Sequence, residues 1–209
     1  MKSLNKKNYF NDAVNNVIAN EKLYNSIIKL QNELVVFMNR QPKVVAIVAP
    51  RDRRHSSLMA KAVSEVYAFN NEKTLLMDLD MHEPTINKLY NLDSEKSLID
   101  LVQEDPKEMA LKINEYLDVV VSKTETYQAK FLVSNEFKDI MSKLKDGYDH
   151  IIVVLPPVLE NQDVLLLNDS LDAVVLVTKK NETIIKDIKS SINFLKSNKL
   201  PFVGTIFIN

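Results

Sequence analysis

Charged side chains that could bind a phosphorylated ligand gather in two short segments of the sequence. The first segment contains Arg53, Arg54 and His55, and the second contains Asp78 and Asp80. Cationic side chains at the start of a helix favour an anion such as phosphate. Carboxylates are ligands that Mg²⁺ prefers. The residue types therefore point to a phosphate or nucleotide site, provided that the fold brings the two segments together.

An alternative for the same residues is a solvated loop with no ligand. In that interpretation Asp52 and Asp80 pair with the arginines, and Ser56 and Ser57 cap a helix over Leu58–Phe69. The two aspartates of the second segment are then solvated or paired with arginine, because Mg²⁺ without nucleotide usually needs more ligands. Ser56 and Asp80 are the weak candidates for a metal ligand, and no metal site is expected.

Short apolar runs alternate with helix-length segments along the chain. Continuous apolar strands separated by helices predict an α/β fold, with a mostly parallel sheet flanked by helices on both faces. Sites in such sheets form beyond the carboxyl ends of the strands, and both charged segments fall there. The predicted strands are Val44–Ala49, Thr74–Leu79, Leu117–Val121, Ile151–Leu155, Ala173–Thr178 and Phe202–Ile208, and the other predicted helices are Ser97–Gln103, Asn135–Lys145, Asp163–Ser170 and Thr183–Ser197.

The N-terminal part of the chain has a different pattern. Apolar residues at spacings of three and four predict a helix over residues 11–39, which Pro42 ends. We therefore expect an N-terminal helical arm over 1–40 and an α/β domain over 41–209, together forming one globular unit. A helix packed on the domain is favoured over an arm used in assembly.

The composition excludes several classes of function. The 209 residues carry a net charge of −1, which gives no general attraction to nucleic acid or to membranes. The chain has no cysteine, so disulfides and thiolate metal sites are excluded. No secretory signal is recognisable, and apolar runs such as Ile151–Val158 are too short to span a bilayer. The expected location is the cytoplasm.

Several segments together resemble one protein family. The strand and turn over 74–92, which contain Asp78-Leu79-Asp80-Met81 and then Pro84, resemble the second aspartate motif of bacterial tyrosine kinases of capsule and exopolysaccharide systems. Residues 148–158 resemble the Walker B strand of that family, and 172–178 and 204–209 resemble two further strands. The likeness covers about 21–209. It implies the deviant Walker-type P-loop NTPase fold of the MinD/ParA-like ATPases.

The phosphate-binding loop of that family is not preserved here. A P-loop needs glycines, so that successive backbone N–H groups can wrap a phosphate, and a lysine for the β and γ phosphates. The resemblance places His55 at the lysine, and Asp52 and Arg54 at glycines, while Ser56 and Ser57 keep the hydroxyl pair. Side chains at positions 52 and 54 would fill space that the phosphates need. The chain has only two glycines, and neither lies in this loop.

The Walker B position also departs from the family. Val154 stands where an aspartate would hold the Mg²⁺ water, a role that an isopropyl group cannot take. An asparagine at the position of Asn209 contacts adenine in the wider class. The resemblance thus implies degenerate nucleotide-binding positions and no catalytic residue; these positions are Arg53, Arg54, His55, Ser56, Ser57, Asp78, Asp80, Val154 and Asn209.

The leading hypothesis is a catalytically inactive, tyrosine-kinase-like pseudokinase that acts as a structural or regulatory partner in capsular or exopolysaccharide biosynthesis. The resemblance implies as partner the cytoplasmic part of a membrane co-polymerase or chain-length protein, or an active kinase paralogue. This partner would hold the protein at the inner face of the membrane, and no cofactor is expected. The alternative is an active ATP-binding tyrosine kinase or ATPase that uses ATP and Mg²⁺ at an atypical site. A third reading, a membrane-surface protein of the MinD/ParA type, is disfavoured because no amphipathic helix follows Asn209.

Overall fold

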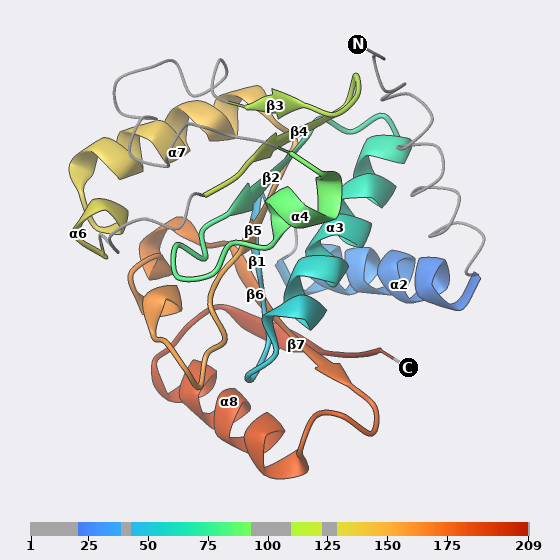
Figure 1. Ribbon diagram of the computed structural model, residues 1–209, viewed down its shortest axis with the longest axis vertical. Helices are drawn as coiled ribbons and strands as arrows, with labels where there is room; N and C mark the ends of the chain where they lie inside the picture. Colours follow the sequence, from blue (N-terminus) through green and yellow to red (C-terminus); the bar gives the residue numbers. More distant parts are fainter. Residues whose placement is uncertain (1–20, 39–42, 93–109, 123–128, 209) are drawn as a thin grey trace.

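Strands of the described residues form one twisted sheet in the order β3-β4-β2-β5-β1-β6-β7. The computed structural model describes residues 21–38, 43–92, 110–122 and 129–208 (Figure 1). Neighbouring strands are parallel except β3 and β4, which are antiparallel. The strands are β1 Val44–Val48, β2 Thr74–Asp78, β3 Leu111–Lys112, β4 Leu117–Val120, β5 His150–Val154, β6 Ala173–Lys179 and β7 Phe202–Ile208.

The predicted α/β class and mostly parallel sheet are confirmed. Every residue of the central strands β1, β2 and β5 is buried, as expected for continuous apolar runs covered on both faces. Each of the six predicted strands is present, with ends that differ by one residue or less. The two-residue strand β3 was not predicted, because it carries no apolar run of its own.

Helices cover both faces of the sheet. On one face lie α2 Glu21–Met38, α3 Arg53–Phe69 and the short α4 Ile86–Tyr90; on the other lie α6 Ala129–Leu132, α7 Asn135–Gly147 and α8 Ile185–Ser197 (Figure 1). Alternate residues of β1 enter the two cores, since Val45 packs on the α3 side and Ala46 on the α7 side. None of the described helices is long and apolar enough to cross a membrane.

Helix α2 packs against α3 and β7. Its residues Ile27, Leu30 and Leu34 are buried, at the helical spacing of three and four, and join the core on that face. This part of the predicted N-terminal helix therefore lies on the sheet domain. The remainder of the prediction, residues 11–20 and 39, lies outside the described residues.

Of the other predicted helices, one is replaced by 3₁₀ turns and one lies outside the described residues. The segment predicted as one helix over Asp163–Ser170 instead forms two 3₁₀ turns, Asp163–Leu165 and Asn168–Ser170. The side chain of Asn161 accepts a bond of 2.8 Å from the backbone N–H of Asp163, at the start of the first of these turns. The helix predicted over Ser97–Gln103 lies outside the described residues.

Candidate functional site at the strand ends

Helix α3 begins at the carboxyl end of β1, and Asp52 is its N-cap. The Oδ1 atom of Asp52 accepts a hydrogen bond of 3.0 Å from the backbone N–H of Arg54. This cap starts the helix at Arg53, five residues before the predicted start at Leu58, because a capping aspartate satisfies the first free N–H groups. Arg53, Arg54 and His55 are therefore part of the first helical turn.

The predicted capping role of Ser56 and Ser57 is wrong. Both serines lie inside the first two turns of α3, and their hydroxyls donate to the backbone oxygen of Arg53 at 3.0 and 2.9 Å. Ser57 also contacts the hydroxyl of Thr85 from the segment after β2. The two serines thus attach the start of α3 to itself and to the neighbouring loop.

The Arg53 side chain lies among acidic groups at the ends of β2 and β5. Its Nε donates to Asp80 Oδ2 at 2.9 Å, its Nη1 pairs with Glu83, and its Nη2 lies 3.5 Å from Glu160 Oε2. The Asp80 side chain is 1% exposed and that of Arg53 is 21% exposed. This pairing of Asp80 with an arginine was predicted as the alternative to a Mg²⁺ site, whereas Glu83 and Glu160 were not anticipated.

Asp78, at the end of β2, is neither solvated nor paired with arginine, contrary to the sequence-based expectation. It is fully buried, and its carboxylate accepts backbone N–H bonds from Asp80, Thr85 and Ile86 at 3.1, 2.8 and 2.9 Å. These bonds hold the loop between β2 and α4 against the sheet. Burial raises the pKa of Asp78 to about 6, although the three backbone bonds act in the opposite direction.

The raised pKa of Asp78 predicts a pH-dependent stability. Because the folded pKa of about 6 exceeds the ordinary 3.8, the folded state holds this proton more tightly than the unfolded state. The cost of the buried charge is absent below about pH 4 and complete above about pH 6. We therefore expect the wild type to lose about 3 kcal/mol in free energy of unfolding, relative to Asp78→Asn, as the pH rises across this window. Urea denaturation of both proteins from about pH 4 to pH 7 measures this difference. A constant difference would contradict the prediction.

His55 stands where the resemblance places the P-loop lysine, and its ring is turned toward two carboxylates. Its Nε2 lies 3.2 Å from Glu182 Oε2 and 3.8 Å from Asp52 Oδ2. The side chain is 7% exposed, so its position is fixed by the surrounding protein. Glu182 comes from the connection between β6 and α8. Glu182 was not singled out from the sequence.

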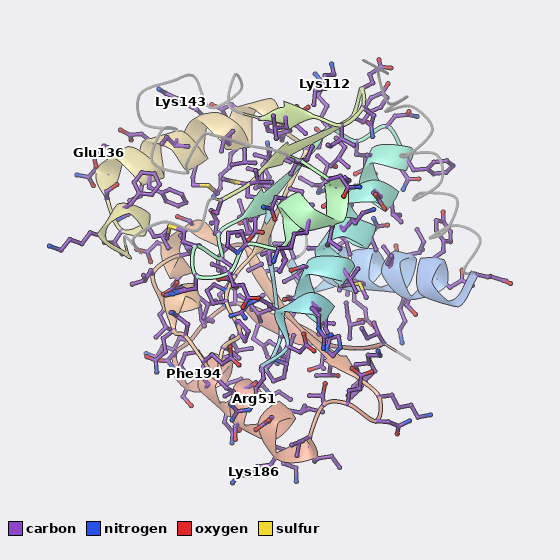
Figure 2. All side chains as sticks on the ribbon, viewed as in Figure 1. Arg51, Lys112, Glu136, Lys143, Lys186 and Phe194 are labelled. Atoms are coloured by element: carbon purple, nitrogen blue, oxygen red, sulfur yellow. The ribbon has the colours of Figure 1, made fainter. Side chains whose placement is uncertain are left out.

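The two arginines beside Arg53 bind other acids. Arg54 is 74% exposed and pairs with Asp52, and this contact lowers the pKa of Asp52 to about 2. Arg51 lies beside α8 (Figure 2), where its Nε donates to Asp187 at 2.8 Å. Each arginine of the loop thus has a carboxylate partner.

Val154 and Asn209 complete the predicted set. Val154 is fully buried at the end of β5, opposite Asp78 in the sheet register, and its backbone oxygen accepts a bond from Leu79. Its side chain belongs to the core on the α3 side. Asn209 lies outside the described residues. The structure therefore gathers the other predicted positions at one sheet edge, where cations and carboxylates pair with one another.

Comparisons with known proteins find similarity to bacterial tyrosine-protein kinases. No protein-family model matches the chain. The tyrosine-protein kinase YwqD of Bacillus subtilis is 27% identical over 173 residues, which cover 81% of this chain and 73% of that protein. The tyrosine-protein kinase ptk of Acinetobacter johnsonii is 21% identical over 154 residues, which cover 72% of this chain. The match spans only 21% of the length of that second relative.

Solved structures show the same fold. The crystal structure of the chimerical protein CapA2B2 matches with a TM-score of 0.83 at 19% identity, over 94% of this chain and 89% of that one. The kinase domain of the Escherichia coli tyrosine kinase ETK matches with a TM-score of 0.73 at 18% identity, over 79% of this chain and 66% of that one. A MinC:MinD cell division complex of Aquifex aeolicus matches with a TM-score of 0.65 at 16% identity, over 79% of this chain and 68% of that one.

Proposed function

Because the chain belongs to the bacterial tyrosine-kinase family, we propose that it is a catalytically inactive member that acts as a structural or regulatory partner in capsular or exopolysaccharide biosynthesis. The observation that carries this proposal is the position of Arg53. Its guanidinium binds Asp80, Glu83 and Glu160, which are the carboxylates beside the loop. An internal cation thus occupies acidic groups that an external Mg²⁺ would need.

The residues present do not fit a magnesium–ATP complex. The loop from Pro50 to Ser57 contains no glycine, so a close wrap of backbone N–H groups around a phosphate is not supported. The ring of His55 is directed to carboxylates, and the side chain of Val154 is buried in the core. Without a lysine and a Walker B aspartate, little remains to neutralise the charge of a transferring phosphoryl group.

The proposed place of action follows from the family and not from the site. A pseudokinase of this kind would act in the cytoplasm, at the inner face of the membrane. It would bind the cytoplasmic part of a polysaccharide co-polymerase or chain-length protein, or an active kinase paralogue. The net charge of −1 supports a protein partner over nucleic acid.

Nucleotide binding tests the proposal directly. We expect calorimetric titration of the full chain with ATP or ADP in the presence of Mg²⁺ to give no binding tighter than about 100 µM. The Bacillus subtilis kinase YwqD, assayed beside it, is the positive control. A dissociation constant below about 100 µM for this chain would overturn the proposal.

The alternative is an atypical but active ATP-binding kinase or ATPase. The observation in its favour is that Ser56, Ser57, Asp78 and Asp80 lie together at the strand ends. It requires phosphate release or autophosphorylation that Asp80→Ala abolishes. Activity that survives Asp80→Ala would exclude this assignment of the site.

A further inference from the structure

The surroundings of His55 contain a set of atoms that can bind a metal ion. Nε2 of His55 and one oxygen each of Asp52 and Glu182 all lie within 4.8 Å of one another. Two of these residues belong to the start of α3, and the third follows β6. We propose that this His55 cluster (Asp52, His55 and Glu182) binds a divalent transition-metal ion, with Zn²⁺ preferred. The inference is independent of whether the protein binds a nucleotide.

Two of the three separations between the donor atoms are close to those around a tetrahedral ion, and the third, between the oxygens of Asp52 and Glu182, is at most 4.8 Å. Zinc bonds to nitrogen and oxygen are about 2.0–2.2 Å long, which places tetrahedral donors about 3.3–3.6 Å apart. The distances from His55 Nε2, 3.2 Å to Glu182 and 3.8 Å to Asp52, lie on either side of this range. Small movements of the two carboxylates would therefore complete a site with three protein ligands and one open position.

Neighbouring groups orient both carboxylates. Oδ1 of Asp52 caps α3 through the N–H of Arg54, which leaves Oδ2 on the side of His55. Oε1 of Glu182 pairs with Lys179, and Oε2 faces the histidine. Hydrogen bonds and charges behind the ligands hold them in place, as the outer partners of metal ligands commonly do.

Arg54, which competes for Asp52, is exposed, whereas His55 is buried. Arg54 also contacts Oδ2 of Asp52, but its side chain is 74% exposed and can turn into solvent when an ion arrives. His55 is 7% exposed and stays beside the carboxylates. An imidazole ligand favours zinc and related transition ions over Mg²⁺ and Ca²⁺, which prefer oxygen ligands alone.

Metal titration of the full chain, purified without a polyhistidine tag and stripped of metal, tests the proposal. We expect one equivalent of Zn²⁺ to bind in competition with a chromogenic chelator, and Co²⁺ to give the strong visible absorption of tetrahedral coordination. His55→Asn and Glu182→Gln are each expected to weaken binding by roughly tenfold or more. Because Glu182 is 46% exposed, Glu182→Gln keeps the fold intact even if His55→Asn disturbs it.

His82→Asn is the matched control, since His82 is a 35% exposed histidine at another strand end. We expect this variant to bind Zn²⁺ as the wild type does. The proposal is overturned if the wild type takes up no ion, if Glu182→Gln binds as tightly as the wild type, or if His82→Asn is the variant that loses the ion.

Discussion

We expect Asp78→Ala to lower the free energy of unfolding by about 3 kcal/mol at neutral pH. The substitution removes the acceptor of three buried N–H groups, those of Asp80, Thr85 and Ile86. Each unsatisfied buried donor costs about 1–3 kcal/mol. Release of the buried charge, whose cost is reflected in the raised pKa of Asp78, offsets part of this loss. Urea denaturation followed by circular dichroism measures the change.

Asp149→Ala is the control for this prediction. Asp149 immediately precedes β5 and accepts a bond of 2.8 Å from the N–H of Lys73, in an exposed position. Water can replace that acceptor, so we expect a loss of about 1 kcal/mol or less. Equal losses for the two variants would show that Asp78 does not anchor the loop between β2 and α4.

Arg53→Met is expected to have the second largest effect, a loss of about 2 kcal/mol in the free energy of unfolding. Methionine keeps the apolar stem but leaves the Asp80 carboxylate, 1% exposed, without its cation. Removal of one partner from a buried ion pair costs about 3–5 kcal/mol. We expect a loss below this range because the Arg53 side chain is 21% exposed. In addition, Asp80 still accepts bonds from the N–H groups of His82 and Glu83.

Arg54→Met, at the next residue, distinguishes this effect from a general loss of positive charge. The Arg54 side chain is 74% exposed, and its ion pair with Asp52 is open to solvent. Surface ion pairs contribute little to stability, so we expect the thermal unfolding midpoint of Arg54→Met to stay close to that of the wild type. A larger loss of stability for Arg54→Met than for Arg53→Met would contradict the buried pairing of Arg53 with Asp80 and the exposed pairing of Arg54 with Asp52.

The pattern of apolar residues was sufficient to predict the fold. A run such as Ile151–Leu155 has apolar residues on both sides of the strand, so it is stable only with helices on both faces of the sheet. The order of such runs and of the helices between them predicted a mostly parallel sheet and located the charged segments at its edge. The two 3₁₀ turns over Asp163–Leu165 and Asn168–Ser170 were not predicted, because the apolar spacing of this segment indicated one continuous helix.

The sequence by itself determined the strands, the sheet class and the departure of the phosphate loop from the family pattern, since these depend on residue types and on local periodicity. Only the tertiary structure decided which arginine binds Asp80, that Asp78 serves the backbone of its own loop, and that Glu182 faces His55. These contacts join residues up to 127 positions apart. Their formation depends on which strand ends lie side by side, and a one-dimensional pattern does not specify that.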